Sequence, residues 1–232
     1  MRLECRQLNL TYPGSAVPVL SGLDAVFDQP GFHAIFGPSG VGKTSLARVL
    51  ADPADRMGHQ VLTRDMDVRL YSYNLERLPG WADIGTLLAR VTPSGRTELA
   101  RELIRTFELE QLLGARYSRL SMGQQNRINL VRYLVQDFDL LILDESLANV
   151  DEQLRGRIIS AVKAGFPDRM FLYISHNLTE VATFCRQILV LGRSRGRGHR
   201  CVAGMDWVQP ETGRSPEREN LDRTMLEIMN AV

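Results

Sequence analysis

The stretch Gly37-Pro38-Ser39-Gly40-Val41-Gly42-Lys43-Thr44 decides the fold, because it fits the phosphate-loop pattern G-x-x-x-x-G-K-[ST]. The mostly apolar run 32–36 before it is typical of a buried strand, and apolar residues at helical spacing after it predict a helix from about Lys43. Glycines let the backbone N–H groups turn inward, and the helix dipole adds partial positive charge. The stretch therefore predicts a nucleoside triphosphate site, in which Lys43 reaches the β- and γ-phosphates and Thr44 contacts Mg²⁺.

The composition narrows the possible classes of protein. A chain of 232 residues is long enough for one sizeable domain with an inserted lobe. Lys+Arg 28 and Asp+Glu 27 give a net charge of +1, so no general attraction to nucleic acid or acidic membranes is expected. The three cysteines are far apart and form no C-x-x-C pair, which favours reduced thiols over a disulfide or zinc framework. We expect no secretory signal in residues 1–6 and no membrane span, because no run approaches roughly 20 apolar residues.

The first part of the chain is rich in predicted strands. Apolar and polar residues alternate over 7–12, and a second strand region is expected over 17–27. Tyr12 lies just before a Pro-Gly-Ser turn, where it would either stack on a nucleotide base or simply end the strand. A further strand is predicted over 68–73, so that Asn74 follows its last residue.

The composition then becomes helical. Residues 84–113 are rich in Leu, Ala, Arg and Glu, and predict two or three amphipathic helices broken at Pro93-Ser94-Gly95. Because no linker precedes them, an inserted helical lobe is expected rather than an independent domain. Residues 56–68 are interpreted as short strands or loop, and Leu78-Pro79-Gly80-Trp81 as a turn with an exposed aromatic side chain.

Two apolar runs deliver polar residues to one edge of the predicted sheet. Leu140–Leu143 is typical of a central parallel strand and ends in Asp144-Glu145, where an open α/β sheet forms its ligand crevice. A solvated acidic loop is the alternative, but it explains the preceding strand less well. Phe171–Ile174 predicts a second such strand, which places His176 at the same edge and favours a functional over a structural histidine.

Helix starts and a basic run complete the chain. Ser121 is either the N-cap of the helix that follows or lies just before it, and Asn177 with Glu180 forms a capping pair. The glycine-rich basic run Arg193–Arg200 is interpreted as a solvated loop, with contact to lipid headgroups or RNA as the alternative. A terminal helix is expected over 221–232.

In this order and spacing, the motifs resemble those of the ATP-binding subunits of ABC transporters, over residues 3–192. Four segments carry the resemblance: Gly37–Ser45 for the Walker A loop, Leu120–Gln124 for the LSGGQ signature, Leu140–Glu145 for Walker B and Ser146–Asp151 for the D-loop. Tyr12, Asn74 and His176 match the adenine-stacking aromatic, the Q-loop glutamine and the switch histidine. Several motifs in one order are far more specific than any of them alone.

The resemblance implies an α/β fold with a P-loop NTPase (RecA-like) core, in which a mostly parallel sheet is joined by N-terminal antiparallel strands and an inserted helical subdomain. A single ABC ATPase domain would cover residues 1–232. Its parts would be a nucleotide-binding core of 1–75 and 120–192, a helical lobe of 76–119 and a C-terminal extension of 193–232.

The resemblance also implies ATP and Mg²⁺ held between two subunits arranged head to tail. The resemblance assigns ATP binding to Tyr12, Gly37, Pro38, Ser39, Gly40, Val41, Gly42, Lys43, Thr44 and Ser45. It assigns Mg²⁺ binding to Thr44, Asp144 and Asn74, and catalysis to Glu145 and His176. From the opposite subunit, ATP would be contacted by Ser121, Gly123 and Gln124. Glu145 would be the general base toward water, and His176 would contact the γ-phosphate.

The expected partners are a second copy of the chain and membrane-spanning permease subunits on the cytoplasmic face of the cell membrane, with no nucleic acid. Import of a small solute comes first, because Leu78-Pro79-Gly80-Trp81 is similar to the Leu-Pro-Trp segment of nitrate, sulfonate and taurine importer ATPases. An exporter subunit comes second. Met122 replaces a signature glycine and Asn74 is one methylene shorter than glutamine, so a low-turnover, ATP-gated regulatory or scaffold module is the third hypothesis.

Overall fold

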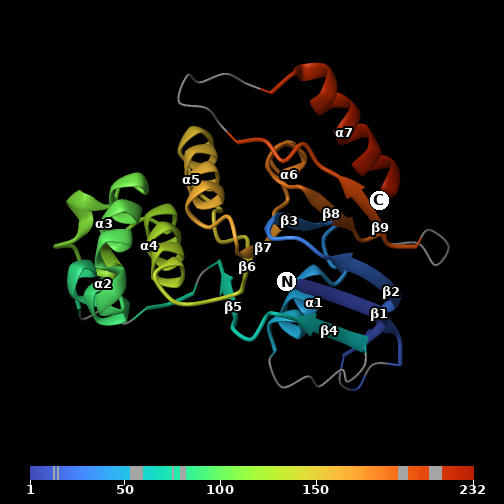
Figure 1. The fold of residues 1–232 in the computed structure, drawn as a ribbon, viewed down its shortest axis with the longest axis horizontal. Coiled ribbons are helices and arrows are strands. Elements are labelled where there is room, and N and C mark those ends of the chain that lie inside the picture. The colour runs from blue at the N-terminus through green and yellow to red at the C-terminus, as the bar shows by residue number, and fades with distance from the viewer. Residues whose placement is uncertain are drawn as a thin grey trace. The chain divides into compact units, whose positions relative to one another are not determined.

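The computed structural model describes residues 1–12, 14, 16–52, 60–74, 76–78, 82–192, 198–208 and 216–232. They form two compact units. Unit 1 comprises Met1–Tyr71, Phe138–Asp144 and Phe166–Val232, and unit 2 comprises Ser72–Asp137 and Glu145–Gly165. Figure 1 shows the ribbon, coloured along the chain.

The strands are β1 (Arg2–Thr11), β2 (Pro18–Phe27), β3 (Gly31–Phe36), β4 (Val61–Arg64), β5 (Arg69–Tyr73), β6 (Leu140–Asp144), β7 (Met170–Ile174), β8 (Gln187–Val190) and β9 (Arg200–Ala203). The α-helices are α1 (Lys43–Ala51), α2 (Ile84–Val91), α3 (Thr97–Thr106), α4 (Met122–Leu134), α5 (Glu152–Gly165), α6 (Leu178–Phe184) and α7 (Arg218–Ala231).

Two sheets organise the strands. β1 pairs antiparallel with both β2 and β4, which gives a three-stranded sheet of order β2-β1-β4. The second sheet has six strands in the order β5-β6-β7-β3-β8-β9, in which β6, β7, β3 and β8 run parallel and β9 is antiparallel to β8. The predicted α/β class, the mostly parallel core and the N-terminal antiparallel strands are confirmed.

The central strands are buried because both of their faces are covered by apolar side chains. On β7, Leu172 belongs to the core that also contains Leu46 of α1 and Leu3 of β1. Phe171, which points to the opposite face, stacks on Phe32 with 5.5 Å between ring centroids. This double burial explains why β6 and β7 appear in the sequence as continuous apolar runs rather than as alternating ones.

The C-terminal part of unit 1 is bonded to its core. β9 pairs with β8. The segment 204–207 after β9 is hydrogen-bonded to the end of α6 and to the residues that follow that helix. Within that segment, backbone N–H groups donate to the carbonyl groups of Arg186, Ala182, Cys185 and Thr183 at distances of 2.8–3.1 Å. Ala182 and Thr183 lie in the last turn of α6, so two of the carbonyl groups at this helix end are thereby satisfied. α7 packs against α6 and β9.

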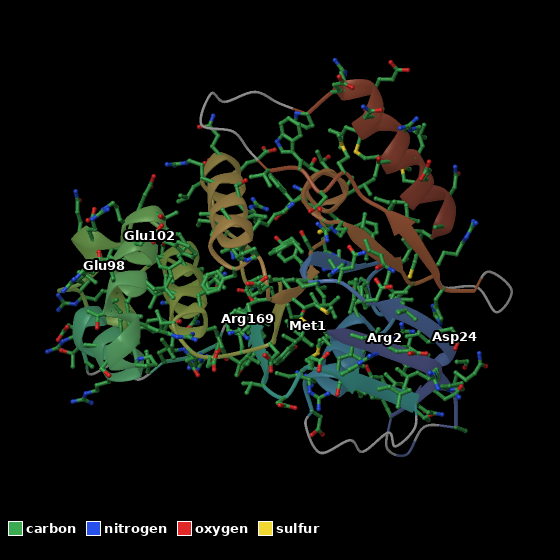
Figure 2. All side chains as sticks on the ribbon, viewed as in Figure 1. Met1, Arg2, Asp24, Glu98, Glu102 and Arg169 are labelled. Atoms are coloured by element: carbon green, nitrogen blue, oxygen red, sulfur yellow. The ribbon has the colours of Figure 1, made fainter. Side chains whose placement is uncertain are left out.

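Unit 2 is mainly helical. α4 packs against α2 and α3, and α3 packs against α5. α3 is amphipathic: Ala100 and Leu103 are buried, whereas Glu98 and Glu102 are exposed (Figure 2). α2 ends before Pro93 and a short 3₁₀ turn separates it from α3, so the predicted break between the helices is confirmed.

Some elements differ from the sequence predictions. β9 includes Arg200, the last residue of the run that was expected to be a loop, and α7 begins at Arg218 rather than at 221. The predicted helical lobe, 76–119, lies within unit 2, which also contains α4 and α5; the predicted division of the domain remains a prediction. Among the described residues, no helix is both long enough and apolar enough to span a membrane.

Candidate functional site

The phosphate loop joins β3 to α1 in unit 1. Gly37, Gly40 and Gly42 have φ angles of 149°, 79° and 104°, which side-chain-bearing residues rarely adopt. At Gly37 a Cβ atom would also lie 2.4 Å from the carbonyl oxygen of Leu191, so glycine is required there for space as well as for conformation. The curled backbone leads directly into the first turn of α1, where N–H groups have no intrahelical partner.

Lys43 is held inside this loop. It is one of only two lysines in the sequence, in a chain whose other basic residues are arginine. Its side chain is buried, and Nζ donates to the carbonyl oxygens of Gly37 and Pro38, both at 2.8 Å. The ammonium group is therefore already placed over the loop that would receive phosphate oxygens.

Two further residues assigned to ATP lie beside the loop and beside each other. The hydroxyl groups of Tyr12 and Ser45 are 2.7 Å apart, within hydrogen-bonding distance. Tyr12 is 56% exposed, so its side chain is accessible to a ligand. Thr44 is exposed at the start of α1, and Ser45 is half-buried.

The strand register brings three predicted segments to one edge of the sheet. Asp144, the last residue of β6, pairs with Ile174 at the end of β7, and Ile174 also pairs with Ile35 near the end of β3. The Asp144 carboxylate, the loop carrying His176 and the phosphate loop therefore all follow the carboxyl ends of adjacent parallel strands. His176 is exposed, whereas Asp144 is buried.

Tyr71 on β5 is a partner of Asp144 that the sequence reasoning missed. Its hydroxyl donates to Oδ2 of Asp144 at 2.7 Å. Burial, followed by the hydrogen bond to this carboxylate, raises the pKa of Tyr71 well above its ordinary value. The tyrosine therefore stays protonated and fixes one oxygen of the Asp144 carboxylate.

Glu145 is the first residue of the second segment of unit 2 and has an uncommon backbone conformation. Its φ angle is 53°, a left-handed value that costs free energy for a residue other than glycine. A turn follows, in which the N–H of Ala148 donates to the carbonyl of Glu145 at 2.9 Å. Asp151 ends this D-loop segment, and its carboxylate accepts from the N–H groups of Gln153 and Leu154 at the start of α5.

The signature segment forms the start of α4. Ser121 is the N-cap: its hydroxyl accepts from the N–H of Gln124 at 3.3 Å, and the Gln124 side chain accepts from the N–H of Ser121 at 2.9 Å. Of the two positions expected for Ser121, the structure shows the N-cap, and the capping box leaves the Ser121 hydroxyl proton available to donate. Gly123 is required by packing, because a Cβ atom there would lie 2.1 Å from the carbonyl oxygen of Asn149.

Asn74, the residue at the Q-loop position, is tied to the same helix. Its Oδ1 accepts from Asn126 Nδ2 at 3.0 Å, and Asn126 also donates to the carbonyl of Ala148 at 2.8 Å. Asn126 thus bridges the Q-loop position and the D-loop. An amide oxygen has two lone pairs, so Asn74 keeps one acceptor position for Mg²⁺ or water.

Glu76 is the centre of a second set of bonds between this segment and α4, here called the Glu76 network. Its carboxylate accepts from Arg132 and from Tyr133, the latter at 2.8 Å. Its backbone carbonyl accepts from Tyr117 at 2.9 Å and from Asn129 at 3.1 Å. The side chains of Glu76 and Arg132 are only 14% and 18% exposed, so the pair is largely withdrawn from water.

The donor set is suited to Mg²⁺ shared with a nucleotide. Mg²⁺ prefers oxygen ligands and is usually held by one or two carboxylates together with phosphates and water. Asp144 and Thr44 supply a carboxylate and a hydroxyl oxygen within unit 1. Among the described residues, no group of three or more His, Cys, Asp or Glu side chains could hold a metal alone.

Four sequence predictions fall wholly or partly on residues that the structure does not describe. Of the segment 56–68, interpreted as short strands or loop, residues 56–59 lie outside the described residues, and the remainder contains β4. Pro13 and Ser15 of the turn after Tyr12, Pro79–Trp81 of the importer-like segment and 193–197 of the basic run lie outside the described residues.

A model described as ABC transporter matches residues 20–148, which is more than half of the chain. The molybdenum import ATP-binding protein ModC of Saccharophagus degradans is 27% identical, over 83% of this chain and 58% of that protein. The taurine import ATP-binding protein TauB of Pseudomonas fluorescens is 27% identical, over 84% and 79%. The ATP-dependent lipid A-core flippase of Xanthomonas oryzae pv. oryzae is also 27% identical, over 83% and 36%.

The chain therefore spans just over half the length of the molybdenum relative. A solved bacterial Atm1-family ABC exporter with ATP bound is 21% identical, with a TM-score of 0.73 over 99% of this chain and 41% of that one. This likeness supports the α/β fold described above.

Proposed function

This chain belongs to the ABC transporter family, and we propose from that premise that it is an ATP-hydrolysing subunit that drives solute transport by separate membrane-spanning subunits. One observation carries the proposal. In unit 1 the phosphate loop, Asp144 and the loop of His176 follow the carboxyl ends of β3, β6 and β7, which are neighbours in register. Ligands of open α/β sheets bind at that edge.

We assign the triphosphate to the glycine loop. Lys43 leaves its carbonyl partners for the β- and γ-phosphate oxygens, the loop N–H groups bind the remaining oxygens, and Ser45 supports the α-phosphate. The Tyr12 ring stacks on the adenine, with its hydroxyl held by Ser45. Thr44 and Asp144 hold Mg²⁺, and Asn74 joins them or orients water. When bound, Mg²⁺ neutralises charge that develops on the phosphates.

We assign the general base to Glu145. The residue follows Asp144 directly, and its left-handed backbone is the kind of local strain that persists at functional positions. The carboxylate takes the proton of the attacking water, and His176 contacts the γ-phosphate. Most of the remaining rate enhancement comes from positioning and from charge neutralisation.

The proposed assembly is a head-to-tail pair with ATP between the two copies. Ser121, Gly123 and Gln124 of one copy approach the phosphates bound by the other. The capping box supports this assignment, because it fixes the Ser121 hydroxyl at a helix N-terminus, where anions are favoured. ATP binding closes the pair, hydrolysis releases it, and the movement passes to permease subunits at the cytoplasmic face of the membrane.

Import of a small solute is the preferred direction, on the strength of the importer-like Leu78–Trp81 segment and of the importer relatives. The flippase relative favours export as the second candidate. A low-turnover regulatory module is the third, since Met122 and Asn74 depart from the family pattern.

Steady-state phosphate release by the purified full chain, with and without membranes holding its permease, tests the proposal. We expect Lys43→Ala to abolish phosphate release. The matched control is Lys163→Ala, because Lys163, on α5, is the only other lysine in the sequence. This variant should retain phosphate release. ATP binding without phosphate release by the unsubstituted chain, even with membranes, would favour the regulatory module instead.

The base assignment has its own test. We expect Glu145→Gln to bind ATP with unchanged affinity but to lose turnover, whereas Glu152→Gln, at the exposed start of α5, keeps both. Normal turnover in Glu145→Gln would refute the assignment of the base.

A further inference from the structure

Glu180 is a buried carboxylate with no part in the site as described so far. It lies in the first turn of α6 and is only 6% exposed. Burying a carboxylate is strongly unfavourable unless hydrogen bonds compensate for the lost water. A glutamate at such a position therefore needs a structural reason, and its hydrogen-bond partners indicate one.

Both carboxylate oxygens of Glu180 accept hydrogen bonds from residues at the end of β7. The Tyr173 hydroxyl donates to Oε1, and the Ser175 hydroxyl donates to Oε2 at 3.2 Å. Tyr173 and Ser175 are themselves buried, at 2% and 8% exposure. Hydrogen bonds to a charged acceptor in a site shielded from water are stronger and more directional than exposed ones.

The bonds close into a ring across the turn between β7 and α6. The Ser175 hydroxyl accepts from the N–H of Asn177 at 3.1 Å. The side chain of Asn177 accepts from the N–H of Glu180, also at 3.1 Å. The ring thus runs from Glu180 to Ser175, on to Asn177 and back to Glu180, and Tyr173 anchors it to the strand.

His176 lies between two members of this ring. The ring fixes the side chain of Ser175 before it and both the N–H and the side chain of Asn177 after it. The backbone on either side of His176 is therefore held, while the imidazole remains at the exposed tip. We propose that Glu180 is a positioning residue that sets the direction of His176 toward the γ-phosphate; this inference rests on the proposed function of His176.

A double-mutant cycle on phosphate release tests the inference. We expect Glu180→Gln, which keeps size and shape, to lower kcat by about 10- to 100-fold with little change in KM for ATP, because a small misplacement of a catalytic group costs that much. In a His176→Ala background, Glu180→Gln should cause no further loss. Tyr173→Phe should give a smaller loss of the same kind, and Thr183→Val, on the same helix, should give none.

If the ring only stabilised the fold, the effects of Glu180→Gln and His176→Ala would multiply, and such multiplication would overturn the inference. A second readout does not need turnover. The imidazole NMR signal of His176, identified by its absence in His176→Ala, should broaden or shift in Glu180→Gln. An unchanged signal would also overturn the inference. Absence of phosphate release from the unsubstituted chain would instead count against the proposed function, and the NMR signal would then decide the role of Glu180.

Discussion

Gly37 offers a test of how tightly the phosphate loop is packed, because Gly40 provides a matched control in the same loop. Both glycines have positive φ angles, 149° and 79°, so alanine at either position costs about 1–3 kcal/mol of backbone strain. Only at Gly37 would the new Cβ atom meet a neighbour, the carbonyl oxygen of Leu191 at 2.4 Å; at Gly40 nothing lies within 4 Å. Overpacking of this kind costs about a further 1–3 kcal/mol.

Thermal unfolding followed by circular dichroism measures the difference. For a chain of this length, 1 kcal/mol corresponds to about 2–4 °C in Tm. Gly37→Ala should therefore unfold about 2–12 °C below Gly40→Ala, and both should unfold below the unsubstituted chain. Equal midpoints for the two variants would refute the reasoning, since they would mean that the contact with Leu191 relaxes at no cost.

Three further predictions concern buried and half-buried side chains. Burial lowers the pKa of His33 below its ordinary value of 6.5. The stability contributed by the neutral imidazole should therefore be fully present above that pH and should fall as the pH drops through the lower folded-state pKa. Urea unfolding between pH 7 and 5 measures this change, and His33→Leu should flatten the slope of the unfolding free energy against pH. Tyr71→Phe should cost about 1–3 kcal/mol in the same assay, because it removes a donor from the buried Asp144 carboxylate. Arg132→Gln should lower the free energy of unfolding by about 3 kcal/mol, because it leaves the Glu76 carboxylate without its ion-pair partner. Combining it with Glu76→Gln removes that unpaired charge and should restore part of the loss.

Each of these has a control or a contradicting outcome. Tyr73→Phe, at a side chain that is 44% exposed, should change stability by less than about 0.5 kcal/mol. A slope against pH that persists in His33→Leu would assign the pH dependence to other groups. Additive losses in the Glu76 and Arg132 double variant would show that the two side chains do not interact.

The sequence predicted those features whose cause is local. Leu140–Leu143 and Phe171–Ile174 were recognisable because burial on both faces of a strand leaves a continuous apolar run. Ser121 and Asn177 were recognisable as helix starts because a capping side chain bonds a backbone group only three residues away. The phosphate loop was recognisable because its residues are contiguous.

The features that were missed depend on partners far apart in the chain. Tyr71 and Asp144 are 73 residues apart, and Glu76 and Arg132 are 56 apart, so no periodicity connects them. β9 was missed for a different reason. Three of its four residues are exposed, and an edge strand without alternation leaves no hydrophobic pattern to recognise.

The backbone bonds of segment 204–207 limit how far the chain can be shortened. A protein truncated after Ala203 would lose the donors that cover the carbonyl groups of Ala182, Thr183 and Cys185. The end of α6 would then fray, and β9 would lose α7, which packs against it. For crystallisation, a shortened chain should therefore retain Trp207, and an affinity tag belongs beyond α7, which packs against α6 and β9.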